Sequence, residues 1–249
     1  MNYFQAEQIS KAYGEKVLFE DISLSISQGD KVGLIARNGT GKTTLMNIIA
    51  GKDQPDDGQL SYRTSLRIAY LEQQPFFEPD HTLSQALLHD DNELTRTIRE
   101  YEELVNQPVE GKDPGQQKRL QQIMERMDAL QAWDYETRMK QILSQLMIPD
   151  LSMKVKELSG GQIKRLALAQ ILIDEADLIL LDEPTNHLDV GMIEWLENYL
   201  VRKKMTLLLV THDRYFLDAV CNEIVELEDG NIYQYKGNYS YFLEKKQER

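Results

Sequence analysis

The residues best suited to chemistry are two consecutive acids, Asp182 and Glu183, which directly follow the apolar run 178–181. A short apolar run bounded by polar residues is typical of a buried strand. Open α/β sheets bind ligands at the carboxyl ends of their parallel strands, so the pattern predicts two carboxylates at a ligand site. For phosphoryl transfer we expect Asp182 to hold Mg²⁺ and Glu183 to point the other way and orient the attacking water.

A glycine loop upstream has the spacing of a phosphate-binding loop, running from Ala36 to Thr44. Residues 31–36 predict a strand before it, and apolar residues at helical spacing predict a helix that begins at Lys42. Glycines let successive backbone N–H groups close around phosphates at the positive end of such a helix. The predicted nucleotide-binding residues of the loop are Asn38, Gly39, Thr40, Gly41, Lys42, Thr43 and Thr44, with Thr43 also a ligand of Mg²⁺.

Ala36 stands where the usual loop pattern has its first glycine. With a negative φ the extra methyl group costs little, whereas a positive φ would strain the loop. The backbone conformation of Ala36 therefore decides whether the substitution matters.

A second glycine motif, Leu158-Ser159-Gly160-Gly161-Gln162, precedes a helical pattern at 163–173. The N-terminus of that helix is again suited to an anion. One nucleotide in one chain can use two helix ends only if they face each other. We therefore expect Ser159, Gly160, Gly161 and Gln162 to act in trans, on the nucleotide of a partner.

Three more side chains are candidates. His212 follows the apolar strand pattern at 206–211 and would reach a γ-phosphate, and Gln73 follows the strand ending at Leu71 and would contact both metal and water. Tyr13 precedes the first core strands and offers an aromatic face for adenine. The catalytic candidates are thus Glu183, His212 and Gln73, and the metal candidates are Thr43, Gln73 and Asp182.

The remaining pattern predicts which elements position these groups. Residues 22–26 alternate as a half-exposed strand, residues 56–58 turn into a strand pair that ends at Leu71, and strands at 224–227 and 232–235 form a hairpin. Residues 82–138 lack these strand patterns and have helical spacing instead. They predict an inserted helical hairpin that turns at 107–115. Its two apolar stripes are Leu94, Ile98, Tyr101 and Val105, and Leu120, Ile123, Met127 and Leu130.

Composition limits the possible classes of protein. A chain of 249 residues can form one sizeable core with an appendage. Cys221 is the only cysteine, so an intrachain disulfide is excluded and a reducing cytoplasm is expected. No signal peptide or membrane span is expected. The net charge of −13 argues against sequence-independent nucleic-acid binding by the whole domain, and residues 84–134 hold only six Lys or Arg against eleven Asp or Glu.

These motifs, in this order, resemble those of ABC ATPases over nearly the whole chain. The resemblance implies an α/β P-loop NTPase cassette with an antiparallel β subdomain and an inserted α-helical subdomain, with ATP and Mg²⁺ as cofactors. It identifies the glycine loop as Walker A, Gln73 as the Q-loop, residues 158–162 as the signature, Asp182 and Glu183 as Walker B with its catalytic glutamate, residues 186–189 as the D-loop and His212 as the switch histidine.

Residues 182–189 and 212–217 resemble more narrowly the ABC-F class, whose members carry two tandem cassettes and act on ribosomes. This implies one cassette over 1–249, with the nucleotide-binding core at 1–81 and 139–238, an arm-like insertion at 82–138 and the start of an interdomain linker helix at 239–249. It also implies a second cassette as partner and contact with ribosomal RNA or tRNA.

Two other functions remain open on sequence alone. The ATP-binding subunit of an ABC membrane transporter would share all of the nucleotide chemistry. A non-enzymatic protein with ATP as a structural ligand is less consistent with the presence of Glu183 and His212.

Overall fold

The computed structural model describes residues 1–88, 93–105 and 114–249, and these form two compact units. One unit contains residues 1–74 and 174–249, and the other contains residues 75–173. In the described part of the chain, no helix is long and apolar enough to cross a membrane. The turn predicted at 107–115 lies largely outside the described residues.

A six-stranded sheet forms the centre of the first unit, with the strand order β5-β6-β7-β3-β8-β9. Its strands are β3 (Lys31–Ala36), β5 (Ile68–Leu71), β6 (Leu178–Asp182), β7 (Thr206–Val210), β8 (Glu223–Glu228) and β9 (Asn231–Tyr235). All neighbours are parallel except β8 and β9, which form the predicted antiparallel hairpin. Every residue of β6 and β7 is buried, as expected for central parallel strands.

A smaller antiparallel sheet in the same unit has the order β2-β1-β4. It consists of β1 (Asn2–Tyr13), β2 (Lys16–Ser27) and β4 (Asp57–Tyr62). The alternation predicted at 22–26 is confirmed, because the apolar residues there are buried and both serines are exposed. The strand pair predicted to end at Leu71 is wrong, because β4 pairs with β1 whereas β5 pairs with β6. Each strand finds its partner far away in sequence, where local pattern gives no information.

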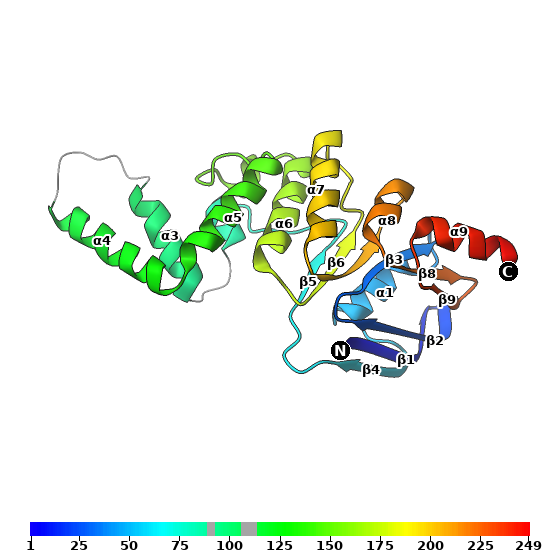
Figure 1. The fold of residues 1–249 in the computed structure, drawn as a ribbon. Helices are drawn as coiled ribbons and strands as arrows, with labels where there is room; N and C mark the ends of the chain where they lie inside the picture. Colours follow the sequence, from blue (N-terminus) through cyan, green and yellow to red (C-terminus); the bar gives the residue numbers. More distant parts are fainter. Residues whose placement is uncertain (89–92, 106–113) are drawn as a thin grey trace. The chain divides into compact units, whose positions relative to one another are not determined.

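Helix α1 (Lys42–Ile49) follows the glycine loop and lies in the core between the two sheets (Figure 1). Its apolar residues Leu45, Met46, Ile48 and Ile49 are fully buried there. Helices α7 (Val190–Arg202) and α8 (Arg214–Val220) follow β6 and β7. Asp189 and Asp213 cap these two helices by accepting backbone N–H groups, which satisfies donors left free at a helix start.

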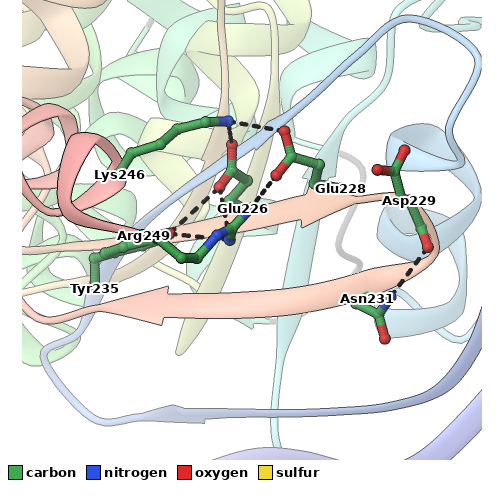
Figure 2. A network of polar contacts seen from close by, with 7 residues as sticks. All are labelled: Glu226, Glu228, Asp229, Asn231, Tyr235, Lys246 and Arg249. Carbon is green, nitrogen blue, oxygen red and sulfur yellow. Dashed lines mark hydrogen bonds and ion pairs between the residues drawn. The ribbon is translucent and has the colours of Figure 1, made fainter.

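The last helix, α9 (Tyr239–Glu248), is linked to the β8–β9 hairpin by ion pairs (Figure 2). Lys246 pairs with Glu226 and with Glu228, and Arg249 pairs with the same two carboxylates. The hydrogen bond to Glu226 is the main cause of the raised pKa of Lys246. The helix predicted at 239–249 therefore exists, and it packs as part of this unit.

The second unit is helical. Its elements are α2 (Leu83–Leu87), α3 (Glu93–Val105), α4 (Pro114–Ala129), α5 (Ala132–Gln145), the 3-10 turn Val155–Glu157 and nearly all of α6 (Gly160–Asp174). Its helices α3, α4 and α5 are green in Figure 1. Helices α3 and α4 form the predicted hairpin, with Arg126 donating to Glu100 and Thr97 across it. Ile98, Ile123 and Met127 of the predicted stripes are buried.

Two details of this unit differ from the predicted pattern. Val105 is exposed although it completes the first stripe. Helix α5 runs continuously through residue 138, the compact unit extends from Pro75 to Ile173, and both helices of the hairpin contact α5. The helical spacing of apolar residues predicts where each helix lies. The extent of the compact unit depends on packing between helices, which that spacing does not describe.

Candidate active site

The glycine loop leaves the sheet at the carboxyl end of β3, where Ala36 pairs with Leu227. Ala36 is not among the residues with a positive φ, so its methyl group is accommodated without strain. Gly39 and Gly41 do have positive φ values, of 77° and 106°. A Cβ at Gly41 would lie 3.1 Å from the Cβ of Leu18, so both backbone conformation and space require glycine there.

Lys42 lies at the start of α1, and its side chain curls back over the loop. Its Nζ donates to the carbonyl oxygen of Ala36 at 2.7 Å and to that of Arg37 at 3.2 Å, and it lies 3.4 Å from Oδ1 of Asn38. Thr40 also closes the loop, because its hydroxyl donates to the carbonyl oxygen of Arg37. The ammonium group is thus held at the mouth of the loop, where an anion would gain most from it.

Lys16 is a second cation at this loop that the sequence analysis missed. Its Nζ donates to the carbonyl oxygen of Gly39 at 2.9 Å. The contact joins residues 23 positions apart, at the start of β2 and in the glycine loop. The position of Lys16 three residues after the candidate aromatic Tyr13 could have suggested a role at the site. Spacing alone, however, does not show which loop the lysine contacts.

The two acids of the central strand differ in their surroundings. Asp182 ends β6 and is buried, with 3% of its surface exposed. Glu183 follows it with a left-handed backbone, φ 52°, and its N–H donates to the carbonyl oxygen of Val210 on β7. A positive φ in a non-glycine residue is uncommon and marks a position fixed by its surroundings. The two carboxylates therefore follow one another at the end of a buried strand, on a backbone that its surroundings fix.

His212 lies beside Glu183, just after β7. Its Nε2 is 3.5 Å from Oε1 of Glu183, and its backbone N–H donates to Oε2 at 3.4 Å. The imidazole is largely exposed, whereas the glutamate side chain is mostly buried. A hydroxyl contact of 3.3 Å between Thr185 and Thr211 joins the two turns that carry these residues. The structure therefore brings these two predicted catalytic residues together.

The phosphate loop and the acidic strand end act on each other electrostatically. Burial lowers the pKa of Lys42, and the negative charges of Glu183 and Asp182 oppose that shift. Burial and the charge of Asp182 also raise the pKa of the Tyr70 hydroxyl on the neighbouring strand β5. A cation for phosphates and two carboxylates are thus gathered at the carboxyl edge of one sheet.

Three other predicted residues occupy the same unit. Thr43 is exposed at the start of α1, and Gln73 is exposed two residues after the end of β5, the strand next to β6. Tyr13 is the last residue of β1 and is 56% exposed. Its hydroxyl donates to Asp53, a residue that the sequence analysis did not single out because 40 positions separate the two.

The oxygen ligands of this edge fit Mg²⁺. A carboxylate on Asp182, a hydroxyl on Thr43 and an amide on Gln73 are hard donors of the kind this ion prefers. Among the described residues, no group of three or more His, Cys, Asp or Glu could hold a metal by itself. Proteins usually bind Mg²⁺ through one or two carboxylates together with substrate phosphates and water.

The signature residues lie in the second unit, at the start of α6. Ser159 and Gln162 form reciprocal bonds there, because Ser159 N–H donates to the Gln162 side chain and Gln162 N–H donates to the Ser159 hydroxyl. This is a capping box, which fixes the beginning of the helix. Ser159 and Gly160 are exposed.

The order of the parallel strands, the glycine loop between β3 and α1, and the acids at the end of β6 define a P-loop nucleotide-binding cassette. The protein family described as ABC transporter matches residues 19–186. The chain belongs to this family and is an ABC-type ATP-binding cassette.

Its relatives include two kinds of named protein. The "Uncharacterized ABC transporter ATP-binding protein YfmR" of Bacillus subtilis (strain 168) is 45% identical over 252 residues, which cover 100% of this chain and 40% of that protein. The "Energy-dependent translational throttle protein EttA" of Escherichia coli (strain K12) is 36% identical over 237 residues, which cover 93% of this chain and 42% of that protein. The chain thus spans less than half the length of these relatives.

Solved structures share the fold. The ATP-binding subunit of an ABC transporter matches with a TM-score of 0.69 and 22% identity, covering 94% of this chain and 90% of that chain. A dimeric cassette bound to ADP and Pi matches with a TM-score of 0.63 and 22% identity, covering 94% of this chain and 98% of that chain. The predicted fold class is confirmed.

Proposed function

We propose that this chain binds and hydrolyses Mg-ATP, and that it forms one half of a composite site completed by a second cassette. The observation that carries the proposal is that the glycine loop and Lys42 follow β3 while Asp182 ends β6 and Glu183 follows it, so both groups lie at the carboxyl edge of parallel strands that only β7 separates. A fixed cation for phosphates beside carboxylates for metal and water is what phosphoryl transfer requires. The net charge of −13 repels a polyphosphate, so binding depends on such local cations.

In this proposal each residue has a defined role. Lys42 and the N–H groups of the glycine loop bind the β- and γ-phosphates. Asp182 and Thr43, with Gln73, would hold Mg²⁺, which when bound neutralises developing charge on the phosphates. Glu183 accepts a proton from the attacking water, and His212, held beside it, contacts the γ-phosphate.

The second cassette supplies Ser159, Gly160, Gly161 and Gln162 in trans, at the N-terminus of its helix α6. The exposed, capped start of that helix supports this role. The partner is either a second copy or a further cassette of a longer protein, with α9 as the start of the linker. We expect the 249-residue chain alone to hydrolyse ATP slowly, at a rate per molecule that rises with protein concentration. Fast hydrolysis at a rate independent of concentration would contradict the composite site.

The physiological role we propose is that of an ABC-F-type translation factor in the cytoplasm, in contact with ribosomal RNA or tRNA. The similarity to translational throttle proteins and the α3–α4 hairpin support it. The alternative is the ATP-binding subunit of an ABC membrane transporter, which the name of the Bacillus relative favours.

Sedimentation separates the two roles. The Glu183→Gln chain, which should retain ATP, is mixed with ribosomes or with membrane vesicles in Mg-ATP and pelleted. Lys42→Ala, which should not bind ATP, is the matched control. Co-sedimentation with ribosomes that requires both ATP and Lys42 supports the translation role, whereas its absence, together with ATP-dependent recovery on vesicles, contradicts it.

A further inference from the structure

We propose that Asp53, held in place by Lys11, is a positioning residue that fixes the ring of Tyr13 for stacking on the base of the bound nucleotide. The inference rests on the ATP site proposed above. It assigns the base end of that site a specific polar support, separate from the groups that bind phosphate.

The first observation is a hydrogen bond between distant parts of the chain. Oη of Tyr13 donates to Oδ2 of Asp53 at 2.9 Å. Tyr13 ends β1, and Asp53 follows α1, the helix that the glycine loop opens. The bond therefore ties the aromatic side chain to the far end of the phosphate-binding helix.

The second observation is that Asp53 is itself held by an ion pair. Nζ of Lys11 lies 2.9 Å from Oδ1 of Asp53, donates to the carbonyl oxygen of Gln54 at 2.6 Å and lies 3.5 Å from Asp56. The Lys11 side chain is 9% exposed. The hydrogen bond between the two groups raises the pKa of Lys11 and lowers the pKa of Asp53. Asp53 is therefore a charged acceptor for the phenol, and charge-assisted bonds are the stronger kind.

The third observation concerns the ring itself. The ammonium group of Lys11 lies over the Tyr13 ring, 5.5 Å from its centroid, so the cation occupies one face. Tyr13 is nevertheless 56% exposed, which leaves surface for a ligand. An exposed aromatic side chain normally exchanges rotamers within nanoseconds. The hydrogen bond from the hydroxyl to Asp53 restricts the ring to one rotamer before a ligand binds. Stacking on the ring then costs less conformational entropy.

The position of this strand end points to a nucleotide base. Lys16, three residues after Tyr13, donates to the carbonyl oxygen of Gly39 in the phosphate loop. The β1–β2 turn is thus attached to the loop on one side, while Tyr13 is attached to the end of α1 on the other. The base of a nucleotide whose phosphates lie in that loop would therefore meet the exposed ring of Tyr13.

The test compares two ligands that differ only at this end, Mg-ATP and Mg-tripolyphosphate, by titration calorimetry on the 249-residue chain. Asp53→Ala removes the acceptor, and Tyr13→Phe removes the hydroxyl but keeps the ring. Each should weaken Mg-ATP binding by about three- to tenfold, the size of one modest hydrogen bond, and leave tripolyphosphate binding unchanged. The double variant should be no weaker than Asp53→Ala, because both changes remove the same contact.

Tyr62→Phe is the matched control. It removes a phenol hydrogen bond of 3.0 Å from β4 of the same sheet to Ile48 of the same helix and involves neither Tyr13 nor Asp53, so it should leave both affinities unchanged. Equal weakening of ATP and tripolyphosphate, or unchanged ATP binding in both Asp53→Ala and Tyr13→Phe, would overturn this inference alone. A parent chain that binds neither ligand would overturn the proposed function.

Discussion

The phosphate end and the base end of the candidate site are supported in different ways. Asp182 and Glu183 lie at the end of β6, which is buried along its whole length, and Lys42 begins the helix that follows β3 and the glycine loop. Tyr13 ends a strand of the small antiparallel sheet and depends on one hydrogen bond to Asp53. We infer that buried strands fix the groups that perform chemistry, whereas exposed polar contacts adjust affinity. Changes at the phosphate end should therefore have the larger effects.

The largest effect is expected at Glu183. Glu183→Gln keeps the shape and the contact with the His212 backbone but removes the base, so single-turnover hydrolysis should slow by about 10²- to 10⁴-fold. The affinity for ATP should stay unchanged. Quenched-flow measurement at saturating Mg-ATP tests this, with the exposed Glu194→Gln on α7 as control. A rate within tenfold of the parent would remove Glu183 from the catalytic role.

Gly41→Ala tests how strictly the loop geometry is fixed. The new methyl group meets both a φ of 106° and the Cβ of Leu18 at 3.1 Å, so we expect a loss of about 1–3 kcal/mol of unfolding free energy and weaker ATP binding. Gly51→Ala is the control, because it has a φ of 71° but nothing within 4 Å. Urea denaturation of both variants measures the difference. If Gly51→Ala were equally destabilising, close packing against Leu18 would not contribute.

Tyr13→Ala tests the base end. Loss of the ring should weaken Mg-ATP binding by roughly 1–3 kcal/mol, the usual value of base stacking. The preference for ATP over GTP should change only modestly, because any base presents a stacking face. Calorimetric titration with both nucleotides measures this. Unchanged affinity for ATP would remove Tyr13 from the site.

Ala36→Gly should have the smallest effect. Ala36 has no positive φ and pairs in β3, so glycine gains nothing and costs about 0.5–1 kcal/mol of stability. ATP affinity should be the same in both proteins. Tighter ATP binding by Ala36→Gly would show that the methyl group obstructs the loop.

The same contrast separates what the sequence could predict from what it could not. Strands β3, β6 and β7 and the start of α1 were predicted because each carries its own pattern, an apolar run followed by a glycine loop or by polar residues. The hairpin β8–β9 was predicted because its partners are adjacent in sequence. His212 was predicted to reach a γ-phosphate from the end of its strand, and it lies beside Glu183 because parallel strands end at one edge.

Long-range contacts could not be predicted in this way. The bond from Tyr13 to Asp53, the contact of Lys16 with Gly39 and the different partners of β4 and β5 depend on how sheets assemble. The left-handed backbone of Glu183 has no sequence signal, since glutamate shows no preference for that conformation. These positions are set by tertiary packing.

The central claim is that the loop from Gly39 to Thr44 binds Mg-ATP with Lys42 as its main cation, and thermal unfolding tests it most directly. Mg-ATP at about 100 times its dissociation constant should stabilise the fold by roughly 2.7 kcal/mol. For a chain of this size that corresponds to a rise in melting temperature of about 5–10 °C. Lys42→Ala should lose most of the rise. An unchanged melting temperature of the parent in millimolar Mg-ATP, or an equal rise in Lys42→Ala, would contradict the account.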